Sequence, residues 1–415
     1  MILFNWSNLV FSCDYFSNLL ICLSSLLIIS CIIISWNSIK FMIKEFYSLL
    51  IFIDFLLIFI FISFDLSLFY IFFELILIPI FMIIIIWGSR LEKFKAAYYL
   101  FFYTLIGSLI MLLSFFYIYN EIGSTSWYYL NIIKLNKSLV ICISIIISMA
   151  IKIPILPFHI WLPQAHVEAP ISGSILLAGI LLKIGCYGLI RFCVLLFYED
   201  IIIIKPILII LSFTAIIYGS MITIRQVDLK KLVAYSSISH MGFINLGLLS
   251  NTYIGITGSI IIMISHGFIS SSLFIIVTSL YDKYHTRLIR YYKGIIIHMP
   301  LISFLFLILL VINLAFPFTI NFWGEILIFK SIIYLKKNIL LIIIISLHCI
   351  FSSIYSFNLI NKVIFNKESK YLINKRDMTK NEFFIILIFI LITIFFGFKY
   401  NFIYNIELFC KYILS

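Results

Sequence analysis

The chain has 415 residues, of which 64% are hydrophobic and 11% charged, and its formal net charge is +12. Soluble domains carry about 25% charged residues, so this composition and the mean hydropathy of +1.20 exclude an ordinary soluble protein. Apolar runs recur along the whole length, and a run of about 20 residues crosses a hydrocarbon core as a helix. Because lipid offers backbone amides no hydrogen-bond partner, we expect an all-α, polytopic membrane bundle.

The apolar runs predict about twelve crossings by the length rule. The predicted spans cover residues 17–36, 48–64, 67–87, 94–118, 138–162, 171–197, 203–224, 230–250, 254–280, 300–335, 338–363 and 382–404. We interpret residues 1–415 as a single membrane domain. The N-terminal segment has neither a basic n-region nor an Arg/Ser-rich presequence, so we expect no cleaved targeting segment.

The positive charge is distributed unequally between the two sides of the predicted bundle. One side carries Lys40, Lys44, Arg90, Lys93, Lys95, Arg225, Lys230, Lys231, Lys283, Arg287, Arg290, Lys293, Lys362, Lys367, Lys370, Lys375, Arg376 and Lys380. The other side carries only Lys134, Lys137, Lys205, Lys336, Lys337 and Lys411. By the positive-inside rule the basic side faces the matrix, or a bacterial cytoplasm. The excess charge is therefore a topology signal, and we expect no nucleic-acid partner.

Two predicted spans are interrupted by proline. The fifth contains Pro154 and Pro157, and the tenth contains Pro317 followed by Glu325. Proline removes a backbone donor and clashes with the preceding turn, so each break frees carbonyl groups inside the membrane. Transporters place their ion sites at such discontinuous helices.

The order of the spans predicts an internal repeat. Residues 48–197 and 203–363 each contain five predicted crossings, and the interrupted helix is the fourth in both. An odd number of crossings forces the second copy to be inverted relative to the first. The predicted helices 17–36 and 382–404 flank the two repeats.

Ionisable residues recur deep inside the predicted spans. They are Glu74, Lys152, His159, Lys183, His240, His266, Glu325 and His348. A charged side chain near the bilayer centre costs about 3 kcal/mol on insertion scales, so a chain that carries so many at one depth is expected to use them. Lysine, glutamate and histidine can change charge, whereas arginine stays protonated, and the deep series contains no arginine. This pattern predicts a path for protons.

Each of these residues also has a purely structural interpretation. His159 and His348 could be packing residues that bond across helices, and Glu74 with Lys183 could form a static ion pair. Arg191 and Lys330 lie near span ends, where long cationic side chains reach the interface. Asp54 and Asp65 bracket a short span and are interpreted as boundary residues.

Cofactor-binding motifs are absent from the sequence. It has no G-x-G-x-x-G fingerprint, no P-loop and no Cys/His pattern with metal-ligand spacing. The eight cysteines are dispersed, without a C-x-x-C pair, and are interpreted as apolar packing residues. We therefore expect the chain to bind no nucleotide, metal or iron–sulfur cluster.

Several segments resemble a known family. The segments FFELILIPIFMIIIIWG, WLPQAHVEAP, RQVDLKKLVAYSSISHMGF, MISHGFISSSLFI and INFWGE are similar to the antiporter-like membrane subunits of respiratory complex I, and among them to the type called chain 4. The resemblance extends from about Leu66 to Lys330. It implies two inverted five-helix repeats with broken fourth helices. Members of this family have fourteen spans, which is two more than predicted here. The two additional spans lie at the N-terminus of those members.

The resemblance also implies roles for individual residues. Glu74 matches a glutamate that pairs with the lysine of the first broken helix, here Lys152. Lys183 matches a lysine on the central axis, and Glu325 matches the glutamate of the second broken helix. The connecting histidines correspond to His240 and His266. His159 and His348 match less securely.

The function implied is proton translocation in the membrane arm of a proton-pumping NADH:ubiquinone oxidoreductase in the mitochondrial inner membrane, or in the plasma membrane of a bacterium. This chain would have no redox site, since FMN, iron–sulfur clusters and ubiquinone would be bound by other subunits. Sister antiporter-like subunits and membrane lipid would be its partners. Alternatives are a cation/proton antiporter without a redox partner, a haem-binding electron carrier that uses His240 and His266 as axial ligands, and a bare scaffold.

Overall fold

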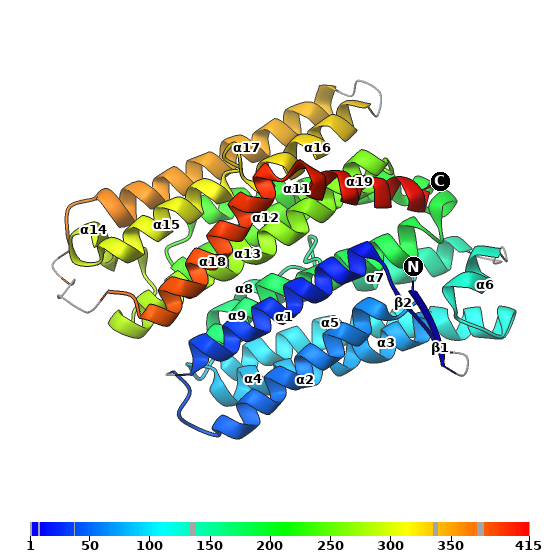
Figure 1. Cartoon of the computed structure of the whole chain (residues 1–415), viewed down its shortest axis with the longest axis horizontal. Coiled ribbons are helices and arrows are strands. Elements are labelled where there is room, and N and C mark those ends of the chain that lie inside the picture. Colours follow the sequence, from blue (N-terminus) through cyan, green and yellow to red (C-terminus); the bar gives the residue numbers. More distant parts are fainter. Residues whose placement is uncertain are drawn as a thin grey trace.

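The computed structural model describes residues 2–6, 9–36, 38–132, 138–334, 339–369, 371 and 377–414. Within these residues, nine helices are long and apolar enough to cross a membrane, and shorter apolar helices supply parts of the interrupted crossings. The helices lie side by side in an elongated bundle (Figure 1). The predicted fold class is thus confirmed. Among the basic residues used for orientation, those outside the described residues are Lys134, Lys137, Lys336, Lys337, Lys370, Lys375 and Arg376.

The first half of the chain begins with an antiparallel hairpin that the sequence analysis did not predict, formed by β1 (Ile2–Trp6) and β2 (Leu9–Cys13). The hairpin is followed by α1 (Tyr15–Ser35), α2 (Ile43–Ile62), α3 (Leu66–Leu75), α4 (Leu77–Trp87), α5 (Lys93–Ile122) and α6 (Trp127–Ile132). Asp65 begins α3, where its carboxylate accepts a hydrogen bond from the Ser67 amide at 2.9 Å. A short side chain that accepts from the first turn is favourable at this position. The interpretation of Asp65 as a boundary residue is therefore confirmed.

The first interrupted crossing has the predicted place. It consists of α7 (Ser138–Lys152), an irregular stretch over 153–160, and α8 (Trp161–Glu168). The indole Nε1 of Trp161 donates to the carbonyl oxygen of Ile151 at 3.0 Å, so a side chain satisfies one carbonyl that the break frees. The following crossing contains two π-helical turns and consists of α9 (Ile171–Leu176), η1 (Leu177–Leu181), α10 (Leu182–Gly188) and η2 (Leu189–Val194).

The second half of the chain begins at Tyr198. Its elements are α11 (Tyr198–Arg225), α12 (Leu229–Leu249), α13 (Tyr253–Tyr284), η3 (Ile289–Tyr291), α14 (Ile295–His298), α15 (Pro300–Asn313), α16 (Ile320–Tyr334), α17 (Ile339–Leu359), η4 (Ile360–Phe365), α18 (Lys380–Phe398) and α19 (Tyr400–Leu414). The interruption between α15 and α16 is again in the fourth crossing of its group. The inverted relation of the two repeats stays a prediction.

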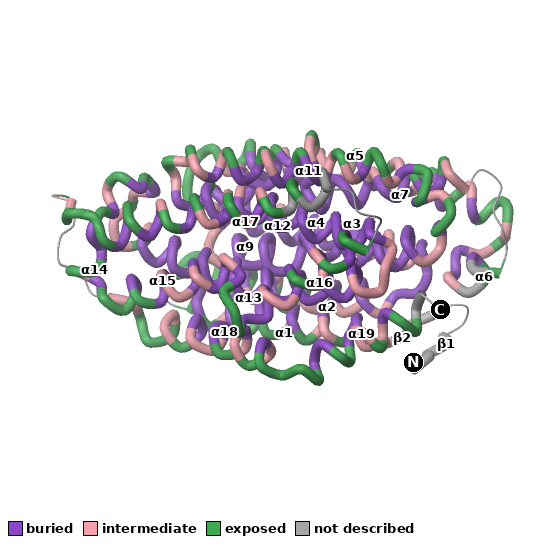
Figure 2. Tube along the Cα trace, turned by 90° about the horizontal axis from the view of Figure 1, so that it is seen from above, coloured by how far each residue is buried: buried purple, intermediate pink, exposed green. Residues whose placement is uncertain are grey.

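The centre of the bundle is formed by α12, α13 and the crossing over 171–194, whose apolar windows are almost wholly buried. Figure 2 shows buried residues throughout the middle of the bundle and exposed residues around its edge. Helix α13 packs against α9, α12, α16, α18 and α19. A Cβ atom on Gly258 would lie 2.9 Å from the carbonyl oxygen of Gly324, so glycine is required where α13 and α16 cross closely.

Two predictions are wrong: the end of the last span and the position of Asp54 relative to its helix. The last predicted span, 382–404, ends earlier, because α18 stops at Phe398 and a separate helix, α19, begins at Tyr400. Asp54 is not a boundary residue, since it lies in the middle of α2 and is half-buried. Gly397 and Lys399 were a sequence signal for the end of α18, whereas nothing in the apolar run around Asp54 showed that its helix continues on both sides.

The interpretation of Arg191 as an interfacial residue is also wrong. Its side chain is 4% exposed, and Nη1 lies 2.7 Å from Oδ2 of Asp14. The guanidinium group also lies 4.6 Å from the ring centroid of Phe64. The ion pair joins the segment before α1 to the crossing that contains Lys183. Lys330, by contrast, is exposed, and its position at the interface stays a prediction.

Replacing Arg191 with Met should lower the free energy of unfolding by about 3–5 kcal/mol, because Asp14 would keep a buried charge without its partner. Asp14→Asn combined with Arg191→Met should recover most of this loss. The measurement is the temperature at which half of the detergent-extracted chain aggregates. Lys330→Met, which removes an exposed cation, is the control and should not change that temperature. An unchanged midpoint for Arg191→Met would contradict a structural role for the pair.

Candidate functional site

Lys183 lies at the centre of the bundle, on α10 between two π-helical turns, and is fully buried. Its Nζ donates to the carbonyl oxygen of Ala178 at 2.6 Å and lies 3.0 Å from Nδ1 of His266 on α13. Among the described residues no carboxylate lies within ion-pair distance of this amine. A buried amine bonded to an imidazole can exchange a proton with it, since each group can hold or release one.

Three histidines continue from this contact. The ring centroids of His266 and His240 are 5.6 Å apart, and those of His240 and His348 are 5.2 Å apart. All three side chains are buried. His348 stacks on Phe243 with a centroid distance of 4.9 Å. The row therefore passes from α13 to α12 and then to α17.

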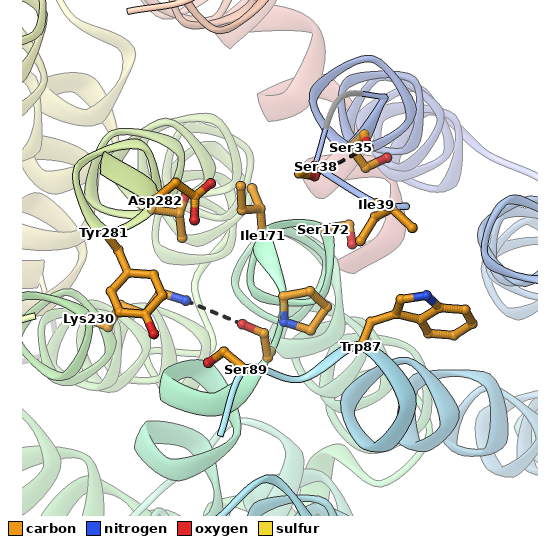
Figure 3. A pocket seen from close by; sticks show the side chains of 13 residues that line it. Ser35, Ser38, Ile39, Trp87, Ser89, Ile171, Ser172, Lys230, Tyr281 and Asp282 are labelled. Carbon is orange, nitrogen blue, oxygen red and sulfur yellow. Dashed lines mark hydrogen bonds between the residues drawn. The ribbon is translucent and has the colours of Figure 1, made fainter. Parts of the chain in front are cut away.

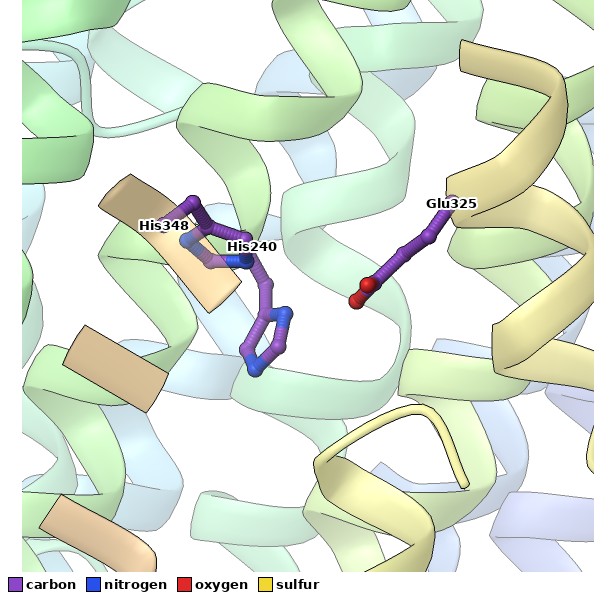
Figure 4. A group of neighbouring side chains, drawn as sticks. All are labelled: His240, Glu325 and His348. Carbon is purple, nitrogen blue, oxygen red and sulfur yellow. The ribbon is translucent and has the colours of Figure 1, made fainter. Parts of the chain in front are cut away.

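Glu325 lies at the far end of the row, on α16 just after the second break. One ligand atom from each of His240, His348 and Glu325 lies within 4.8 Å of the others, and Figure 4 shows the carboxylate directed toward the two rings. Cys349 donates to Oε2 of Glu325 at 3.7 Å. Lys183, His266, His240, His348 and Glu325 thus form one buried row, which we call the central row.

Two residues that the sequence analysis missed support this row. The hydroxyl of Tyr355 lies 3.4 Å from Nε2 of His240, and it accepts a hydrogen bond from Nδ2 of Asn313 at 3.1 Å. Asn313 is the last residue of α15, at the break itself. A signal was available in the sequence, because His348, Ser352 and Tyr355 follow helical spacing and share one face of α17.

Glu74 and Lys152 do not form the direct ion pair that the resemblance implied. Within the described part of the chain, no ion pair joins either residue to a partner. Lys152 Nζ instead lies 3.7 Å from the ring centroid of Phe73, so an aromatic face occupies the place beside the ammonium group. Glu74 is half-buried on α3, and the static pair of Glu74 with Lys183 is likewise not formed. The charges of Glu74 and Lys152 still interact through space.

Lys152 packs closely against α10, the helix of Lys183, at the position of Gly185. A Cβ atom on Gly185 would lie 3.1 Å from Cβ of Lys152 and 2.7 Å from the side chain of Ile153. Only glycine therefore lets the broken helix approach α10 at this level. His159 lies elsewhere, in the break, where its ring centroid is 5.1 Å from that of Tyr218. No contact described for His159 joins it to the central row.

A second group of buried charges lies at the basic side of the bundle and was also missed. A cavity of about 150 Å³ opens there, lined by Ser89, Ser172, Lys230, Tyr281 and Asp282 among others (Figure 3). Lys230 is buried, and its Nζ donates to the carbonyl oxygen of Ala169 at 3.3 Å. This residue lies in the RQVDLKK segment, which the sequence analysis used to orient the bundle and to recognise the family, without assigning Lys230 to a site.

The WLPQAHVEAP segment lies beside this cavity. Its Glu168 accepts from Arg287 at 3.0 Å, and Arg287 also donates to Ser89 at 2.8 Å. His166, from the same segment, is fully buried and stacks on Phe274 with a centroid distance of 4.6 Å. Neither ring nitrogen of His166 has a hydrogen-bond partner within the described structure.

Comparisons with known proteins agree with this architecture. A family model described as NADH:quinone oxidoreductase/Mrp antiporter, transmembrane, matches residues 63–352. NADH-ubiquinone oxidoreductase chain 4 of Metridium senile is 47% identical over 395 residues, covering 94% of this chain and 80% of that protein. The corresponding chain 4 of Chondrus crispus is 44% identical over 377 residues, covering 90% of this chain and 76% of that protein.

Two solved structures share the fold. A chain of respiratory complex I from Thermus thermophilus with bound NADH has a TM-score of 0.88 at 24% identity, covering 100% of this chain and 89% of that chain. An archaeal membrane-bound sulfane sulfur reductase contains a chain with a TM-score of 0.84 at 23% identity, covering 95% of this chain and 67% of that chain. The fold and the family model define an antiporter-like transmembrane protein. More narrowly, the chain belongs to the NADH-ubiquinone oxidoreductase chain 4 family.

Replacing Lys183 with Met should leave the stability of the fold unchanged or raise it by about 1–2 kcal/mol. Removing a desolvated amine that lacks a carboxylate partner relieves several kcal/mol, whereas the lost bond to His266 costs about 1 kcal/mol. The same aggregation assay measures the difference. Arg191→Met is the matched comparison, because it removes a buried cation that does have a carboxylate partner. A loss as large as that of Arg191→Met would contradict the assignment of Lys183 as a functional, unpaired cation.

Proposed function

We propose that this chain is a proton-translocating membrane-arm subunit of NADH:ubiquinone oxidoreductase, and that it lies in the mitochondrial inner membrane. The observation that supports this most directly is the central row, which connects Lys183 to Glu325 through buried histidines. The redox assembly in this proposal is taken from the name of the chain 4 relatives, NADH-ubiquinone oxidoreductase. We further propose that the chain holds no redox centre, so that FMN, iron–sulfur clusters and ubiquinone are bound by other subunits, with sister antiporter-like subunits as neighbours.

The proposed path begins at Glu74 and Lys152. Quinone reduction elsewhere in the assembly changes the electrostatic interaction between these two charges. When Glu74 no longer offsets the positive charge of Lys152, the ammonium group repels a second cation on the neighbouring helix more strongly. Lys183 then releases its proton, because its amine has a neutral form and its surroundings are apolar.

The contacts support a definite order for the following transfers. Lys183 gives its proton to Nδ1 of His266, the nitrogen that lies 3.0 Å away. The proton continues to His240 and then reaches Glu325, with His348 and the hydroxyl of Tyr355 beside the final step. Gaps longer than a hydrogen bond need a water molecule or a ring rotation. Arg191 takes no part, since its charge is fixed and paired.

Protons enter the path from the basic side in this proposal. The cavity beside Lys230 has a volume of about 150 Å³, enough for a few water molecules at about 30 Å³ each. His166 lies buried in the segment whose Ala169 and Pro170 line this cavity. These residues would pass a proton inward to restore Lys183 after each release.

A cation/proton antiporter that works without a redox partner is the second candidate, because the description of the matching family model also names the Mrp antiporter. It would use the same buried residues. The two candidates differ in what accompanies the chain in the membrane.

Gentle detergent extraction and native-gel separation distinguish them. We expect the chain, identified by mass spectrometry, to migrate in a large band that stains for NADH dehydrogenase activity, because a membrane-arm subunit stays with its redox partners. The control is a small soluble dehydrogenase of the same compartment, which should stain at a different position. Recovery of the chain only in a small assembly without flavin would contradict the complex I assignment and favour the antiporter.

Lys183→Met should reduce NADH-driven proton pumping by about tenfold or more, because it removes a group that transfers the proton. NADH oxidation by a hydrophilic artificial acceptor should continue, since that reaction needs no membrane transfer. Pumping is followed by a pH-sensitive dye in proteoliposomes that hold the assembled complex. Lys330→Met, at an exposed lysine of α16, should pump normally. Normal pumping by an assembled Lys183→Met complex would show that Lys183 is not on the path.

A further inference from the structure

His240, Glu325 and His348 form a group that the proton path does not fully explain. A simple relay needs one group after another, yet here two imidazoles and a carboxylate from three helices converge, with ligand atoms within 4.8 Å of one another. The carboxylate side chain extends from α16 toward the two rings, which come from α12 and α17 (Figure 4). We propose that these three side chains bind a divalent transition-metal ion of the Zn²⁺ class, and that the bound ion blocks the path.

The unsatisfied nitrogens of His348 support this site. The side chain is 1% exposed, and neither Nδ1 nor Nε2 has a hydrogen-bond partner within the described structure. Buried polar atoms are usually satisfied, so an orphaned imidazole requires an explanation such as a bound ion or water. His240 has a long contact of 3.4 Å to Tyr355 at Nε2 and also interacts with the side chain of Asn313. A metal ion would therefore displace few strong hydrogen bonds.

The donor types select the class of ion. Two imidazole nitrogens with a carboxylate oxygen suit Zn²⁺ and related transition metals, whereas Ca²⁺ and Mg²⁺ prefer oxygen ligands throughout. Cys349 lies outside this group of three, but its Sγ is 3.7 Å from Oε2 of Glu325 and would be the nearest further donor on the carboxylate side. Coordination would release the thiol proton. One carboxylate and one thiolate would then neutralise the divalent charge, which reduces the cost of burying it.

The group must contract to bind the ion. Zinc bonds to nitrogen and oxygen are about 2.0–2.2 Å long, so tetrahedral ligand atoms lie about 3.3–3.6 Å apart. The present spread of up to 4.8 Å therefore has to close by about 1 Å. Rotation about the side-chain bonds of all three residues would supply this movement. The bound ion would join α12, α16 and α17.

The blocking effect rests on the proposed function, whereas metal binding does not. His240 and Glu325 are both members of the proposed path. A coordinated imidazole nitrogen has no lone pair left to accept a proton, and the positive charge of the ion disfavours protonation of the carboxylate bound to it. Binding needs deprotonated ligands, so protons and the ion compete for the same atoms. Zinc should accordingly bind more tightly as the pH rises.

The first experiment measures binding alone. The assembled complex is stripped with a chelator, dialysed against Zn²⁺, and analysed for bound zinc in three forms: with the unchanged chain, with His348→Gln, and with His159→Gln as the control. His159 is another buried histidine of the same chain, but it lies outside the group. We expect the unchanged and His159→Gln complexes to hold one zinc ion more than His348→Gln. Equal zinc contents in all three would overturn the site.

The second experiment measures the effect on pumping. Zinc should inhibit NADH-driven pumping by the unchanged complex and by His159→Gln at the same concentration. In His348→Gln the half-inhibiting concentration should rise tenfold or more, because one ligand is lost. If His348 binds zinc but the metal leaves pumping unaffected, the blocking role is overturned while the metal site stands. Pumping by Lys183→Met without zinc tests the proposed function independently of either result.

Discussion

The hydrogen bond between Lys183 and His266 is the contact on which the rest of the arrangement depends. It joins the last crossing of the first group of helices to the third crossing of the second group, in a place that water does not reach freely. An amine that stays in such a place without a carboxylate partner is costly when charged. The fold keeps it there because α12, α13 and the crossing over 171–194 are enclosed by the other helices.

A second buried cation shows what a structural solution to the same problem looks like. Arg191 lies eight residues after Lys183 in the same crossing, and it is balanced by Asp14 and surrounded by aromatic rings. Its guanidinium group cannot lose a proton, so a fixed partner is the only way to offset its burial. Lys183 has the opposite arrangement, with neutral partners and a titratable group. Arg191 therefore carries a fixed charge with a structural role, whereas the charge of Lys183 can change.

The broken helices serve the site by ending regular structure where polar groups are needed. At the second break, Asn313 ends α15 and Glu325 lies in the first turns of α16, so both groups face the same region as Tyr355 and His240. At the first break, Lys152 is the last residue of α7 and is held beside α10 by the close approach at Gly185. Proline favours these ends, because it lacks the backbone donor and its ring clashes with the preceding turn. Proline alone does not decide them, since α11 continues through Pro206.

The sequence by itself determined the membrane class, the places of the crossings and both interruptions, because length, apolarity and proline act locally. It also identified the members of the central row among its candidates, since ionisable residues in apolar runs are rare. Only the tertiary structure decided which partners these residues have, including Asp14 for Arg191, His266 for Lys183 and Phe73 for Lys152. Helices that are apolar all round carry no periodicity to indicate which face turns inward. Their rotation, and hence every contact between distant segments, follows from packing alone.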